Sequence, residues 1–140
     1  MSANCKMLKI MSLIQILAGV GAGVLAFISF TMPVAEDASG LAAAKPAIVG
    51  VLYFLSGLLS IAAAFSGIRG ANKPRVLGYH DLISALAAGA GAIVCVLAGF
   101  ANGIPFAALA VVFLGIAGAH YGRAAAKEQQ LYRRRPSSAP

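Results

Sequence analysis

The chain has 140 residues, of which 60% are hydrophobic and only 11% are charged, and its formal net charge is +7. Soluble domains usually contain about 45–50% apolar and about 25% charged residues. A water-exposed surface of this composition would be largely apolar, which soluble monomers rarely tolerate. The composition therefore excludes most soluble proteins and predicts an integral membrane protein.

The first apolar segment, residues 10–32, contains no charged side chain and follows a basic N-terminal segment at residues 1–9. A helix of this length reaches about 34 Å, whereas the hydrocarbon core of a bilayer is about 30 Å thick. Because a spanning segment must satisfy its backbone hydrogen bonds internally, we expect a transmembrane helix. A cleavable signal peptide fits less well, since its apolar region is usually about 7–15 residues long.

The second apolar segment, residues 46–68, also lacks charged side chains and begins at Pro46. We expect a second transmembrane helix there, which an outer loop at residues 33–45 joins to the first. Residues 69–81 then form a basic loop on the same side as the N-terminus.

No Lys, Arg, Asp or Glu occurs between Asp81 and Arg123. As one helix this stretch would be about 60 Å long, roughly twice the hydrocarbon thickness. Asn102 and Gly103 are typical of a helix C-terminus, and Pro105 is typical of a first helical turn. We therefore expect two helices and a tight outer turn between them, at residues 82–101, 105–122 and 102–104.

The predicted spans divide the eleven Lys and Arg residues unequally between the two sides of the membrane. Lys45 lies on one side with Glu36 and Asp37, and ten lie on the other: Lys6, Lys9, Arg69, Lys73, Arg75, Arg123, Lys127, Arg133, Arg134 and Arg135. Short loops rich in Lys and Arg stay in the cytoplasm. We therefore expect both termini inside a bacterial plasma membrane, with a basic tail at 123–140 whose end is disordered. This face suits anionic lipid headgroups rather than nucleic acid.

Small residues are expected to hold the helices together. Lipid tails are as apolar as leucine, so transmembrane helices associate mainly where small residues let their backbones approach. The candidate pairs, one in each span, are Gly19 and Gly23, Ser56 and Ser60, Ala85 and Gly89, and Gly118 and Gly122. These pairs predict an all-α four-helix bundle of two antiparallel hairpins, and the same pattern also suits a homo-oligomer or a membrane-protein partner.

Few residues in the spans carry chemistry. No predicted span contains Asp, Glu, Lys or Arg, and we expect Gln15 to hydrogen-bond between helices or to lie near the inner interface. His80 and His120 fall at the inner ends of the third and fourth spans, where antiparallel packing would make them neighbours. The interface explains both, so we expect no metal or haem. Cys5 and Cys95 form no C-x-x-C pair. We expect no catalytic residue and no cofactor.

Two resemblances accompany these patterns. The fragment "YFLSGLLSIAAA" at residues 53–64 resembles the second span of the membrane-spanning four-domain tetraspans, and the layout of two hairpins with cytoplasmic ends is similar. The turn at 102–104 departs from that family, whose second extracellular loop is much longer. The chain also resembles the uncharacterised small four-span membrane proteins of high-G+C bacteria. Neither resemblance assigns a functional residue.

These features predict a non-enzymatic scaffold or accessory subunit that acts through helix contacts. The alternative is an oligomeric transporter or channel subunit for a small solute, without proton coupling through a membrane carboxylate. A polar stripe within the spans would favour the alternative. The Ser and Thr residues are too scattered along the sequence to predict one.

Overall fold

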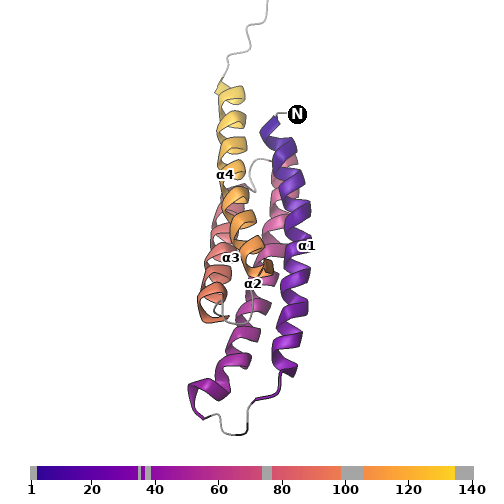
Figure 1. Cartoon of the computed structure of the whole chain (residues 1–140). Coiled ribbons are helices and arrows are strands. Elements are labelled where there is room, and N and C mark those ends of the chain that lie inside the picture. Colours follow the sequence, from indigo (N-terminus) through magenta and orange to yellow (C-terminus); the bar gives the residue numbers. More distant parts are fainter. Residues whose placement is uncertain (1–2, 35, 37–38, 74–76, 99–105, 135–140) are drawn as a thin grey trace, which may run out of the picture.

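The computed structural model describes residues 3–34, 36, 39–73, 77–98 and 106–134. These parts contain four helices: α1 (Ala3–Thr31), α2 (Leu41–Asn72), α3 (Leu77–Ala98) and α4 (Phe106–Arg134) (Figure 1). Each helix is long and apolar enough to cross a membrane. The prediction of an all-helical chain with four such helices is confirmed.

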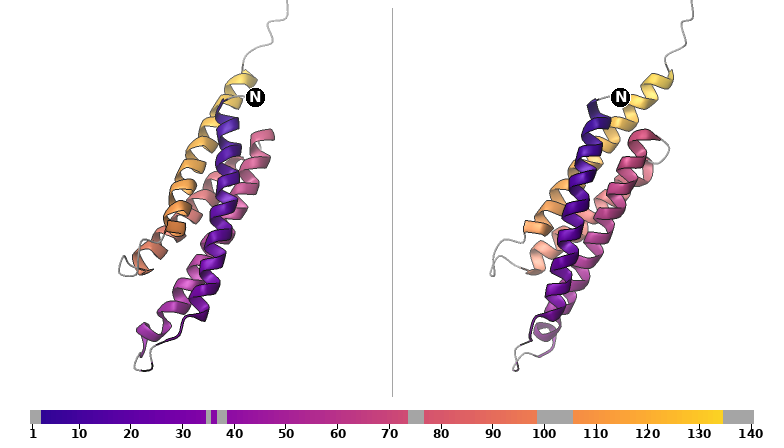
Figure 2. Two further views of the ribbon diagram at one scale, coloured as in Figure 1. Left: turned by 45° about the vertical axis from the view of Figure 1, so that its right-hand side comes forward. Right: turned by 90° about the vertical axis from the view of Figure 1, so that its right-hand side faces the viewer.

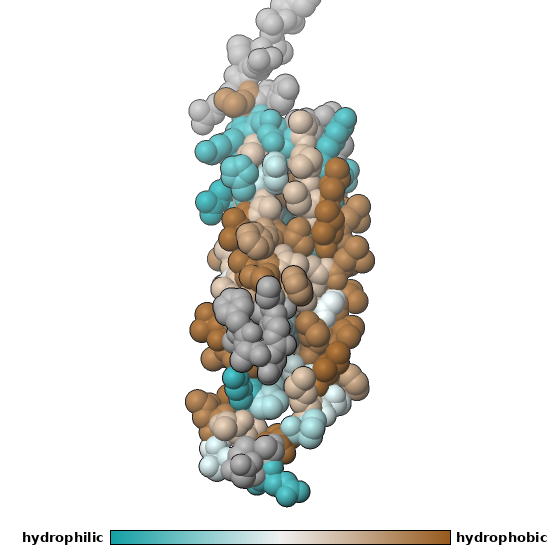
Figure 3. All heavy atoms as spheres, viewed as in Figure 1, coloured by the Kyte–Doolittle hydropathy of each residue, from teal (hydrophilic) through white to brown (hydrophobic). Residues whose placement is uncertain are grey.

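The surface of the molecule is apolar along the middle of the helices. Large hydrophobic side chains such as Leu17, Phe27 and Phe113 are exposed there. Figure 3 shows the hydrophobic residues as a broad band on the viewed face, with hydrophilic residues gathered at its two ends. This distribution suits helices that meet lipid along their length and water at their ends.

The charge-free stretch after Asp81 contains two helices. Helix α3 ends at Ala98 and α4 begins at Phe106, so the alternative of one long helix is wrong. Asn102, Gly103 and Pro105 lie outside the described residues, and the tight turn stays a prediction.

The helices are longer than the apolar segments that predicted them. Helix α1 begins at Ala3 and α4 continues to Arg134. The residues beyond the apolar runs are mostly Ala, Lys, Glu, Gln, Leu and Arg, which favour helix with or without lipid. Helix α2 begins at Leu41, after Gly40 in a left-handed conformation (φ 59°), and therefore contains Pro46. A charged residue marks the end of each apolar segment, but the helix itself continues past that residue.

Successive helices run in opposite directions, and the start of α1 and the end of α4 lie at the same end of the molecule (Figures 1 and 2). A hydrogen bond from Asn4 Nδ2 to Glu128 Oε1, 2.6 Å long, joins α1 to α4 at this end. The hairpin of α1 and α2 extends farther from this end than the hairpin of α3 and α4 (Figure 2). The described basic residues other than Lys45 lie at or near this end, as their positions in the helices require.

Two groups of buried apolar side chains fill the interior. The terminal cluster, near the chain ends, consists of Cys5, Leu8, Ala71, Leu77 and Ala125. The distal cluster, in the other half, consists of Ala22, Ala26, Val49, Tyr53, Ala87, Val94, Ala108 and Val111. Every helix contributes to both clusters.

Candidate functional site: a buried polar layer

Polar side chains occupy the interior between the two clusters. We call this set the polar layer; its members, at most 1% exposed, are Ser12, Gln15, Ser60, His80 and Ser84. Ser56 is equally buried, but it lies one helical turn before Ser60 on α2, beside Tyr53 of the distal cluster. On each contributing helix they lie between a residue of the terminal cluster and one of the distal cluster. The Ser and Thr residues are too scattered along the sequence to predict a polar stripe, but three helices place Ser12, Ser60 and Ser84 in one layer with Gln15 and His80.

The imidazole of His80 is the centre of the polar layer. Its Nδ1 lies 2.9 Å from the backbone oxygen of Ala63 and 3.0 Å from Ser66 Oγ, both on α2. Its Nε2 lies 3.1 Å from the backbone oxygen of Gly118 on α4 and 3.5 Å from Ser84 Oγ. One side chain of α3 therefore contacts the backbones of both neighbouring helices.

These contacts satisfy the imidazole of His80 in either protonation state. A neutral ring can donate from Nε2 to Gly118 while Nδ1 accepts a hydrogen bond from the Ser66 hydroxyl. A protonated ring donates from both nitrogens, to the backbone oxygens of Gly118 and Ala63. The Ser66 hydroxyl then donates to Ala63, whose oxygen is 2.8 Å away. The other neutral tautomer is also accommodated, because Nδ1 can donate to Ala63 while Nε2 accepts from Ser84 Oγ.

Glycines make room for the imidazole of His80 between α2 and α4. A Cβ built on Gly67 would overlap Ser12 Oγ and lie 2.9 Å from His80 Cε1. A Cβ on Gly122 would lie 2.7 Å from His80 Cδ2. At Gly118 the nearest atoms would be 3.4 Å away, which is ordinary contact. The predicted packing pair Gly118 and Gly122 thus lies against His80.

Gln15 lies in the polar layer, where it is fully buried rather than at an interface. Its backbone oxygen accepts a hydrogen bond from Ser60 Oγ at 3.0 Å. Its side-chain oxygen and nitrogen, like Ser12 Oγ, have no hydrogen-bond partner among the described residues. The expected contact between helices therefore forms at the backbone of Gln15 and not at its amide.

The other predicted packing residues divide into an inner and an outer group. Gly19 lies against α2, since a Cβ there would be 2.8 Å from the backbone oxygen of Gly57. Ser56 and Ser60 are fully buried. The remaining residues have open surroundings: a Cβ on Gly23 or Gly89 would meet nothing within 4 Å, and Ala85 and Gly89 are exposed.

The two histidines occupy different surroundings. His120 is exposed, and its ring packs edge-on against Tyr121 with 5.5 Å between centroids, whereas His80 is buried. Beside His80, the carboxylate of Asp81 accepts a hydrogen bond from Arg123 Nε at 3.1 Å. In the described part of the chain, no three His, Cys, Asp or Glu side chains gather where they could hold a metal ion.

Sequence reasoning missed His80, Ser66, Gly57 and Gly67 as interior contacts. The sequence contains a usable signal, because polar residues occur in pairs one helical turn apart. The pairs are Ser12 with Gln15, Ser56 with Ser60, and His80 with Ser84. Residues three or four apart share a helix face.

Comparison with known proteins adds no assignment. No protein-family model matches the chain, and neither the curated proteins nor the solved structures include a significant match.

Proposed function

We propose that this chain is a small integral membrane protein that acts as a non-enzymatic scaffold or accessory subunit through helix contacts. In this proposal it forms a four-helix bundle of two antiparallel hairpins in a bacterial plasma membrane. Both termini face the cytoplasm, because the end of the molecule where α1 starts and α4 ends carries the described basic residues other than Lys45.

The placement of the polar layer supports a scaffold. Apolar side chains lie on both sides of it, in the terminal cluster and the distal cluster. Its hydrogen bonds between described residues connect helices of the same chain, such as His80 to Gly118 and Ser60 to Gln15. The polar groups therefore serve the internal packing, while the apolar outer surface meets lipid or a partner helix.

Photocrosslinking in native membranes tests this proposal. A photoreactive phenylalanine analogue replaces, in turn, one exposed phenylalanine on each of three helices: Phe27, Phe65 and Phe113. We expect one position to give a discrete adduct with a second copy or another membrane protein. The analogue at buried Tyr53 is the matched control and should give no intermolecular adduct. Absence of a protein adduct at every exposed position contradicts the scaffold function.

An alkaline phosphatase fusion after Pro140 tests the orientation. We expect no phosphatase activity, because the enzyme would stay in the cytoplasm. An active fusion would reverse the proposed topology.

A second candidate is an oligomeric transporter or channel subunit for a small solute, without proton coupling through a membrane carboxylate, and the buried imidazole of His80 favours it. Ionisable groups inside membranes are costly and usually functional. Proton permeation into liposomes, followed with an entrapped pH dye, tests this candidate. If it holds, His80→Phe abolishes the flux and Val94→Ala in the distal cluster keeps it. Equal proton permeation with and without the protein eliminates a proton pathway.

A further inference from the structure

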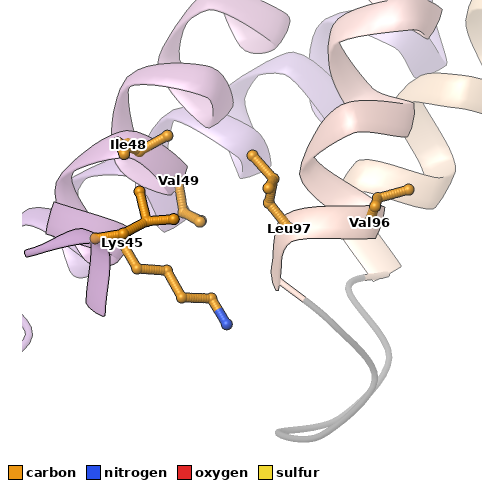
Figure 4. Close-up of a pocket in the computed structure, with 6 residues that line it drawn as sticks. Lys45, Ile48, Val49, Val96 and Leu97 are labelled. Atoms are coloured by element: carbon orange, nitrogen blue, oxygen red, sulfur yellow. The ribbon is translucent and has the colours of Figure 1, made fainter. Parts of the chain in front are cut away.

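A cavity of about 280 Å³ lies between the start of α2 and the end of α3 (Figure 4). Its lining residues are Leu41, Lys45, Ile48, Val49, Val96 and Leu97. The cavity forms because α2 has 32 residues and α3 only 22, so the start of α2 projects beyond the end of α3. Five of the six lining residues are aliphatic; Val49 is buried, whereas the other four are left exposed: Leu41, Ile48, Val96 and Leu97.

Lys45 is the one charged residue of the cavity wall. It is exposed and is the only Lys or Arg between residues 10 and 68. No described acidic residue forms an ion pair with it. Figure 4 shows its amino group extending away from α2 beside the aliphatic side chains. Orientation by charge does not explain this lysine, because it lies at the end with few basic residues.

The aliphatic wall and the amino group of Lys45 together favour one class of ligand. Aliphatic walls suit a hydrocarbon chain, and an unpaired ammonium suits a phosphate that carries a net negative charge. A water-soluble anion would not use Leu41 or Val96, and a zwitterionic lipid offers no net charge to Lys45. We propose that the cavity holds one acyl chain of an anionic phospholipid whose headgroup contacts Lys45. This proposal rests on the membrane placement proposed above.

Tryptophan fluorescence with brominated phospholipids tests the site, since the chain contains no native tryptophan. Val96→Trp places the reporter at the cavity, where the side chain is 79% exposed and an indole can be accommodated. Phe113→Trp on α4 is the matched control at a lipid-facing position outside the cavity lining. Leu41→Trp is a second reporter at the cavity. The protein is reconstituted in mixed bilayers in which either the anionic or the zwitterionic lipid carries bromine.

We expect the anionic lipid to quench Val96→Trp more strongly than its mole fraction predicts, with about a fivefold preference. This ratio corresponds to the contribution of one basic residue near an anionic headgroup. The preference should disappear when Lys45→Gln is added, whereas quenching of Phe113→Trp should follow the mole fraction with or without Lys45.

Three results would overturn the lipid site. They are no preference at either cavity reporter, a preference that survives Lys45→Gln, and an equal preference at Phe113→Trp. A different result would reject the membrane placement itself: no brominated lipid would quench any of the three tryptophans.

Discussion

Two regions of the interior, the distal cluster and the polar layer, are built differently. The distal cluster consists of Ala and Val side chains with one Tyr, and its contacts are van der Waals contacts without direction. The polar layer instead makes hydrogen bonds at fixed angles, and glycine backbones enclose its imidazole. Apolar packing tolerates small rotations of a helix, whereas a ring bonded to two backbones does not. The comparison suggests that the polar layer sets the rotation and register of the helices and that the distal cluster fills the space.

The largest expected effect is the loss of the His80 imidazole. His80→Ala leaves the backbone oxygens of Ala63 and Gly118 without this donor and opens a cavity. We expect the free energy of unfolding to fall by about 3 kcal/mol. Unfolding of the purified protein in detergent, followed by circular dichroism, measures it. His80→Phe separates the two causes, because it restores volume without the hydrogen bonds. If the free energy of unfolding were unchanged in both variants, the polar layer would not set the rotation and register of the helices.

Added volume at Gly67 comes next. Gly67→Ala places a methyl group against Ser12 and His80, and such overpacking costs about 1–3 kcal/mol. Gly89→Ala is the control, since its new methyl meets nothing within 4 Å. It should gain up to about 1 kcal/mol from helix propensity. The same unfolding measurement should therefore give opposite signs, and equal signs would contradict the close packing around His80.

A deletion in the distal cluster should cost less. Val94→Ala removes two methyl groups from a fully buried position. We expect the free energy of unfolding to fall by about 1 kcal/mol. The side chain stays in an apolar environment of lipid or detergent when the helices separate, so only its packing contacts are lost. A loss as large as that of His80→Ala would show that the distal cluster and the polar layer contribute equally to stability, which would contradict the proposed difference between them.

The smallest effect should come from the hydroxyl of Ser66. Ser66→Ala removes the Oγ that lies 3.0 Å from His80 Nδ1, while the backbone oxygen of Ala63 stays 2.9 Å from the same nitrogen. We expect the free energy of unfolding to fall by about 0.6 kcal/mol, which is typical of one hydrogen bond between membrane helices. The unfolding measurement in detergent tests it, and a loss as large as that of His80→Ala would show that Ser66, rather than the two backbone contacts, positions the ring.

The sequence predicted the number of helices correctly but not the polar layer, for a physical reason. Apolar segments show which parts of a chain can lie in lipid, and the four predicted segments correspond to the four helices. The boundary of the third span was placed after Asp81, which left His80 in a loop. A helix follows backbone propensity rather than charge, so α3 begins at Leu77 and includes both residues. Whether Gln15 or His80 faces inward also depends on the rotation of each helix, which only the packing of all four helices determines.

The contact between Asn4 and Glu128 has a consequence for biogenesis. The two residues are separated by 124 positions, so this contact has one of the largest sequence separations possible in the chain. A ribosome delivers α4 last, after α1, α2 and α3 have emerged. Until then His80 has its bonds to α2 but lacks the carbonyl group of Gly118. A chain in which α4 has not yet docked would therefore lack the Gly118 oxygen that His80 Nε2 contacts, and docking of the last helix would supply it.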